Sequence, residues 1–127
     1  MSGRHDVEHT LRELADMLST QAARVRELEK AADAYLHEQG NVEEYTAALH
    51  SKAELLSEIY DAAQPYLQQL PAEHGEGIAQ QLRAFSRNAQ QALNVDSIFF
   101  MRQLLYPEDY VQGEENDLER FIASLRP

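Results

Sequence analysis

Two heptad ladders joined by a Gly-Asn turn dominate this sequence. Apolar side chains of the first ladder recur three, four or seven residues apart, at Val7, Leu11, Leu14, Leu18, Val25 and Leu28. A second ladder of the same kind contains Val42, Tyr45, Leu49, Leu56, Ile59, Ala63 and Leu70. A sustained seven-residue repeat keeps one stripe of an α-helix facing a partner helix. Gly40 is suited to end the first helix, and Asn41-Val42-Glu43-Glu44 predicts a capping box that opens the second. We therefore expect a long antiparallel helical hairpin that resembles a coiled coil.

The predicted fold class is all-α, an antiparallel helical bundle that forms a single domain over residues 1–127. Apolar periodicity predicts three long helices, over 5–39, 42–70 and 77–106, and a short C-terminal helix over 116–126. Pro65 removes a backbone donor and crowds the preceding turn, so the second helix should kink there or stop and restart. Asn116-Asp117-Leu118-Glu119 predicts a second capping box at the start of the short helix.

Two connections are less regular in sequence. Pro71 and the stretch Glu73-His74-Gly75-Glu76-Gly77 predict a loop before the third long helix. The third helix is expected to run on through residues 94–97, with a bend. Asn94 or Asp96 would alternatively cap a new helix that begins at Ile98.

Charge and composition limit the classes of partner. The chain has 11 Lys and Arg against 22 Asp and Glu, a net charge of −11, and this acidity disfavours nucleic acid and anionic membranes. The absence of cysteine excludes disulfides, thiolate metal sites and a cysteine nucleophile. The N-terminus has no apolar signal core, and the longest strictly apolar run, Ile98–Met101, is too short to span a membrane. We expect a cytoplasmic protein that binds another protein or itself.

Histidines are the only candidate metal ligands with suggestive spacing. His5 and His9 lie one helical turn apart, and folding the hairpin about Gly40 brings that turn near Glu73 and His74. The Glu-x-x-His pairs typical of di-iron bundles are absent. Solvated surface histidines are therefore the expected outcome, and no metal or other cofactor is predicted.

Gln21 and Lys52 occupy core positions of the two ladders, opposite Ile59 and Leu28 when the hairpin folds. A polar residue in a coiled-coil core often fixes the register of the helices. Lys52 would alternatively lay its methylenes on the seam and keep its ammonium in water. Catalysis by Lys52 would need a pocket, which two tightly packed helices do not provide. The chain also lacks a nucleophile elbow, a phosphate-binding glycine loop and a His-Glu-x-x-His motif. An enzyme is not expected.

An apolar segment, residues 98–106, carries more hydrophobic surface than one helix seam needs. A helix that is apolar over such an arc must be covered on two sides. One reading has the short final helix fold back so that Phe121 and Ile122 cover this wall. The other makes the wall a binding surface for an amphipathic helix of a partner, or for a second copy of the chain. The residues predicted to make that contact are Phe99, Phe100, Met101, Leu104 and Leu105.

Residues 52–59, Lys-Ala-Glu-Leu-Leu-Ser-Glu-Ile, resemble the Lys-x-x-Leu-Leu-x-x-apolar stretch of the flagellar hook–filament junction export chaperones. Those proteins are small, acidic and all-helical, with a long hairpin followed by a third helix, and the resemblance covers residues 7–105. It departs from that family at Pro65 and at the capped C-terminal helix. The resemblance implies a cytoplasmic chaperone that sequesters the amphipathic terminal helix of an unfolded secretion substrate.

We therefore interpret the chain as a non-enzymatic protein-binding module, of chaperone or adaptor type. A homo-oligomeric structural coiled-coil protein and a metal-binding helical bundle are the alternatives. Whether residues 98–106 form internal core or an interface is left open by the sequence.

Overall fold

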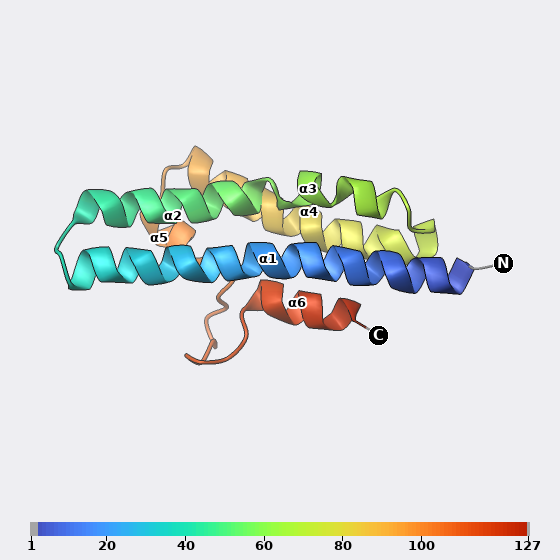
Figure 1. Cartoon of the computed structure of the whole chain (residues 1–127). Helices are drawn as coiled ribbons and strands as arrows, with labels where there is room; N and C mark the ends of the chain where they lie inside the picture. Colours follow the sequence, from blue (N-terminus) through green and yellow to red (C-terminus); the bar gives the residue numbers. More distant parts are fainter. Residues whose placement is uncertain (1–2, 127) are drawn as a thin grey trace.

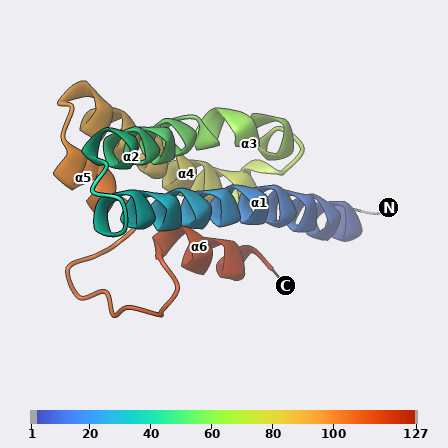
Figure 2. The same cartoon turned by 60° about the vertical axis from the view of Figure 1, so that its left-hand side comes forward.

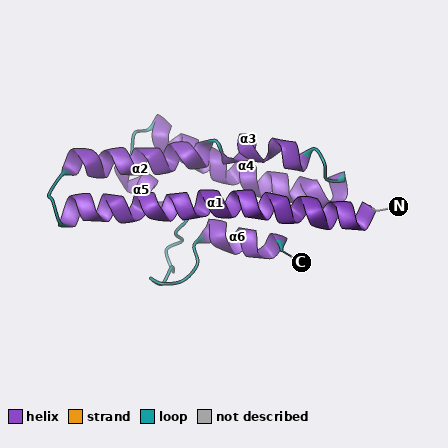
Figure 3. Ribbon diagram, viewed as in Figure 1, coloured by secondary structure: helices purple, strands orange, loops and turns teal. Residues whose placement is uncertain are grey.

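Six helices make up most of residues 3–126, the part of the chain that the computed structural model describes (Figures 1 and 3). In chain order they are α1 (Gly3–His37), α2 (Val42–Ser57), α3 (Ile59–Leu67), α4 (Ala72–Asn94), α5 (Ile98–Gln103) and α6 (Asp117–Leu125). Residues 3–126 contain no strand. The prediction of an all-α helical bundle is confirmed. None of these helices is both long and apolar enough to cross a bilayer.

Helices α1 and α2 lie side by side and are joined at Gly40, where the chain reverses (Figure 1). Gly40 adopts φ +61°, a left-handed conformation that favours glycine and ends the helix. The Asn41 side chain accepts a hydrogen bond from the backbone N–H of Glu44 at 3.1 Å, which confirms Asn41 as the cap of α2. The other half of the predicted capping box does not form, because the Asn41 N–H donates to the Tyr35 carbonyl at 2.8 Å. The ladder residues Leu14 and Leu18 are fully buried. The central part of the heptad stripe therefore lies in the core, whereas Val42, which opens the second ladder, is 61% exposed.

The second helix is interrupted at Glu58, between α2 and α3, and not at Pro65, which lies inside α3. The hydroxyl of Ser86 on α4 accepts a hydrogen bond from the Tyr60 N–H and donates one to the Leu56 carbonyl, both at 3.0 Å. In a continuous helix those two backbone groups would bond to each other. A side chain inserted into the helical ladder is a recognised cause of a break. The break in the helix therefore lies about two turns before Pro65, the position expected from the sequence.

Helix α4 begins earlier and ends earlier than the predicted third helix. Residues 72–77 are helical instead of forming a loop. Gly75 is buried in this part of α4. A Cβ at this position would lie only 3.3 Å from the Cβ of Leu70, so the glycine permits a close approach between the two chain segments. The chain turns at residues 95–97, where Asp96 has φ +51°, and the predicted continuity is wrong. Ser97 caps α5 by accepting a hydrogen bond from the Phe100 N–H at 3.1 Å.

Helix α6 starts with the predicted capping box, which is confirmed by hydrogen bonds in both directions between Asn116 and Glu119. It packs along α1 on the side away from α2 (Figure 1). The Phe121 ring meets the edge of Phe85 on α4, with ring centroids 5.8 Å apart. The reading in which α6 covers residues 98–106 holds only in part. Leu105 and Ile122 belong to one buried cluster, whereas α5 itself lies beside α2 and α4, and α6 lies beside α1. One side of α5 is consequently left uncovered.

Candidate functional site

The predicted partner-binding residues are divided between the core and the surface. Phe99 and Phe100 are 65% and 53% exposed, and their rings meet edge to face at 5.8 Å. Met101 and Leu105 are buried among residues of this chain, and Leu104 is half-buried. The prediction that all five form one contact surface is therefore wrong for Met101 and Leu105. Of these five residues, only Phe99 and Phe100 present large apolar side chains to solvent.

The histidine candidates do not form a cluster in the described part of the chain. His9 contacts Glu13 at 3.4 Å, one turn along the same helix. His74 contacts the neighbouring Glu73 at 4.0 Å. The side chain of His5 lies outside the described residues. Among the described residues, no group of three or more His, Cys, Asp or Glu side chains is arranged to hold a metal ion.

Lys52 is fully buried, so the reading in which its ammonium reaches water is wrong. Its Nζ lies 2.9 Å from a carboxylate oxygen of Glu29 on α1 and donates to the backbone carbonyl of Arg102 at 3.0 Å. The same ammonium lies 5.1 Å from the centroid of the Tyr106 ring, within cation–π range. Burial lowers the pKa of Lys52, and the charge of Glu29 opposes this shift.

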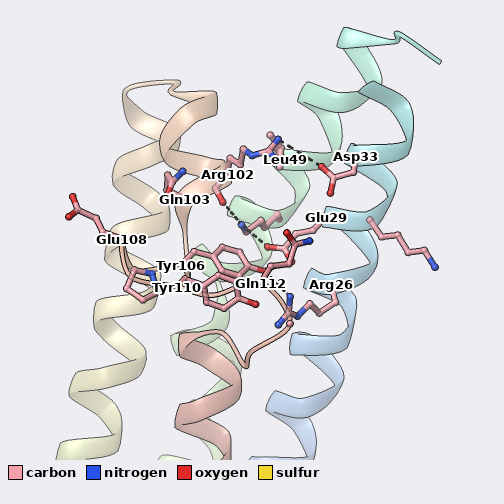
Figure 4. A pocket seen from close by; sticks show the side chains of 14 residues that line it. Arg26, Glu29, Asp33, Leu49, Arg102, Gln103, Tyr106, Glu108, Tyr110 and Gln112 are labelled. Carbon is pink, nitrogen blue, oxygen red and sulfur yellow. Dashed lines mark hydrogen bonds and ion pairs between the residues drawn. The ribbon is translucent and has the colours of Figure 1, made fainter. Parts of the chain in front are cut away.

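Tyr106 extends this buried pair into a network that joins α1 to the C-terminal part of the chain (Figure 4). Its hydroxyl donates to Glu29 at 2.6 Å and accepts from the guanidinium of Arg26 at 3.1 Å. Burial, followed by the bond to Glu29, raises the pKa of Tyr106. Arg26 also donates to both carboxylate oxygens of Glu119, at 2.7 and 3.1 Å. These bonds lower the pKa of Glu119 and raise that of Arg26.

Residues 106–116 form a loop whose two ends lie next to each other (Figure 2). The backbone N–H of Asp117 donates to the Leu105 carbonyl at 3.0 Å and closes it. Leu105 has φ +78°, which is strained for a bulky side chain and directs the chain back on itself. Inside the loop, the rings of Tyr106 and Tyr110 meet edge to face at 4.7 Å. Loops of this compact kind are frequently functional.

A recess of about 780 Å³ lies between this loop and the hairpin (Figure 4). Helix α1 lines it with Arg26, Glu29, Lys30 and Asp33, and helix α2 lines it with Leu49 and Lys52. The other wall comes from Arg102, Gln103 and the loop. The expectation that packed helices leave no pocket beside Lys52 is thus wrong, because a non-helical segment lies over the hairpin here. The recess combines basic, acidic and aromatic groups.

Most members of this cluster were not identified from the sequence. The Lys52–Glu29 pair could be predicted from the sequence, because folding the hairpin places Lys52 opposite Leu28, the neighbour of Glu29. No sequence pattern predicts the contacts of Arg26 with Tyr106 and Glu119, because each contact joins residues that are 80 or more positions apart in the chain. Gln21, the other polar ladder residue, is half-buried.

Comparisons with known proteins assign no family to this arrangement. No protein-family model matches the chain, and neither the curated proteins nor the solved structures contain a match.

Proposed function

We propose that this chain is a non-enzymatic protein-binding module that receives an amphipathic helix of another protein on the Phe99–Phe100 pair. The observation that carries the proposal is the exposure of two adjacent phenylalanines on a helix whose other side is anchored by Met101 in the core. Large aromatic side chains are the usual anchors of protein interfaces. A rigid helix that holds two of them in water presents a preformed contact.

The charges around the pair favour a basic partner. α5 lies beside the first turns of α2, where the Arg102 guanidinium bonds to the Tyr45 hydroxyl at 3.0 Å. The exposed carboxylates of Glu43 and Glu44 precede Tyr45, and that of Asp96 precedes α5. Together with the net charge of −11, this acidic rim would attract a helix that combines apolar anchors with Lys or Arg.

The internal cluster supports a non-enzymatic role. Lys52, Glu29, Tyr106 and Arg26 are engaged with one another and with backbone carbonyls. Groups committed in this way stabilise a structure, whereas a catalytic base or nucleophile needs a reacting atom within hydrogen-bond reach.

The resemblance to flagellar export chaperones gives the sharper form of this proposal. In that form the module works in the cytoplasm, and the partner is the amphipathic terminal helix of a secretion substrate. The small acidic chain, the long paired helices α1 and α2 and the apolar α5 support it.

Affinity capture with the full chain tests the proposal. We expect one dominant partner to be lost in Phe99→Asp while helicity is kept, and to be retained in Val111→Asp, which changes another exposed apolar side chain. The partner should bind through a basic amphipathic segment, and a flagellar secretion substrate would support the sharper form. Light scattering distinguishes the homo-oligomeric alternative, because a wild-type dimer that Phe99→Asp converts to a monomer would mean that the pair serves self-association.

A further inference from the structure

The recess beside Lys52 is less acidic than the chain as a whole. Acidic residues outnumber basic ones two to one in the whole sequence. The basic side chains of Arg26, Lys30, Lys52 and Arg102 line the recess with the acidic ones of Glu29, Asp33 and Glu108, and Glu119, the partner of Arg26, makes the two signs equal. A recess with balanced charges repels an anion less than the rest of this strongly negative protein does.

The basic side chains of the recess differ in how many of their hydrogen-bond donors already have a partner in this chain. Arg26 bonds to Tyr106, Glu119 and the Glu114 carbonyl, so its guanidinium is fully engaged. The ammonium of Lys52 is held by Glu29 and a backbone carbonyl.

Arg102 is different, because the same nitrogen, Nη1, serves both of its partners within the described residues. That nitrogen donates to Tyr45 at 3.0 Å and lies 3.8 Å from Asp33. The Nε and Nη2 donors of the guanidinium, about half exposed at the edge of the recess, remain available to an acceptor (Figure 4). Two adjacent donors in one plane match the two oxygens of a carboxylate or phosphate group.

The walls of the recess also carry apolar and aromatic surface. The paired rings of Tyr106 and Tyr110 and the side chain of Pro107 lie on the loop side, and Leu49 lies on the α2 side. The loop is closed by the bond between the Asp117 N–H and the Leu105 carbonyl, and this closure keeps Leu105 in its strained conformation. Strain of this kind persists where surrounding contacts fix it, and such positions often occur at ligand sites.

From these features we propose that the recess binds a small molecule that carries a carboxylate or phosphate group on a flat apolar body. The anionic group bonds to the guanidinium of Arg102, and the apolar body lies against Tyr106 and Tyr110. This site is independent of the Phe99–Phe100 surface, and neither proposal requires the other.

Amide chemical shifts, recorded by NMR while a probe is added to the full chain at constant ionic strength, test the site. Benzoate and phenyl phosphate are the two anionic probes, and benzamidine is the cationic control. We expect saturable shifts at the backbone amides of Gly113 and Gln103 with at least one anionic probe, and no such shifts with benzamidine. The anionic probe that binds more tightly identifies the group as carboxylate or phosphate.

Arg102→Gln should weaken binding about tenfold or more, the loss expected for a charged hydrogen bond. Arg83→Gln is the matched control, because Arg83 also bonds to a tyrosine hydroxyl at 2.8 Å but lies on α4, outside the recess. Binding in the control should equal that of the wild type. Unchanged affinity in Arg102→Gln, equal shifts with benzamidine, or no saturable shift with either anion would each overturn the proposal. Circular dichroism of both variants checks that the fold is retained.

Discussion

Removal of the Glu29 carboxylate should destabilise the protein strongly. Glu29→Ala leaves the fully buried ammonium of Lys52 without its ion-pair partner and the Tyr106 hydroxyl without its acceptor. Breaking a buried ion pair from one side costs about 3–5 kcal/mol. The lower end of this range applies, because the Lys52 ammonium still donates to the Arg102 carbonyl and still lies over the Tyr106 ring in the variant. We expect a loss of about 3 kcal/mol in the free energy of unfolding and a fall of about 10 °C in melting temperature.

A double-mutant cycle separates the ion pair from the rest of the network. Glu29→Gln keeps an oxygen that accepts from Tyr106, and Lys52→Met keeps the volume of the buried stem. Each single variant leaves one charge buried without its partner, so each should lose about 2 kcal/mol. The double variant removes both charges and should lie within about 1 kcal/mol of the wild type. The coupling energy is then on the order of 3–5 kcal/mol.

Urea unfolding followed by circular dichroism measures these free energies, provided that the slope against urea stays constant. A loss below about 1 kcal/mol in Glu29→Ala, together with a coupling energy near zero, would refute the reasoning. That result would mean that water reaches Lys52 and that the pair behaves like an exposed one.

Three further predictions follow from other contacts. The folded-state pKa of Glu119 is lowered by its bonds with Arg26, so the stability that it contributes is fully present above its ordinary pKa of 4.5 and is lost as pH falls below that value. Glu119→Gln should therefore flatten the acid limb of a stability–pH curve, whereas the exposed Glu115→Gln should leave the limb unchanged. Ser86→Ala strands two backbone groups at the α2–α3 break and should lose about 1–2 kcal/mol in urea unfolding. Ser57→Ala, whose hydroxyl bonds only to its own helix, should lose less than about 0.5 kcal/mol. Asn116→Ala removes a buried helix cap and should lose about 1–2 kcal/mol by the same measurement.

The helical architecture was predictable because its signals are local. The heptad stripe, the left-handed Gly40 and the two asparagine caps each act within a few residues of chain. The break at Glu58 was not predictable, because it depends on a hydroxyl supplied by Ser86 of a later helix. The loop predicted around Gly75 is wrong for a similar reason, because a glycine that permits close packing and a glycine that permits a turn look alike in the sequence.

The candidate site was predictable only in part. The apolar excess of residues 98–106 could be predicted from the sequence. Its division into exposed Phe99 and buried Met101 could not, because it depends on which face of α5 packs against α2 and α4. The amphipathic pattern of α6 specifies that it has a buried face but not which helix covers it. The network of Arg26, Tyr106 and Glu119 depends on the closed loop, and a strained leucine at its start has no signature in sequence.

Photocrosslinking from position 99 tests most directly whether the Phe99–Phe100 pair is a docking surface. A photoreactive phenylalanine analogue at Phe99 keeps the aromatic anchor, and the same analogue at the exposed Val111 serves as the control. The account predicts a covalent product with one partner from position 99, formed through a basic amphipathic helix of that partner and absent from position 111. Equal crosslinking from both positions, or products scattered over many proteins, would contradict the account.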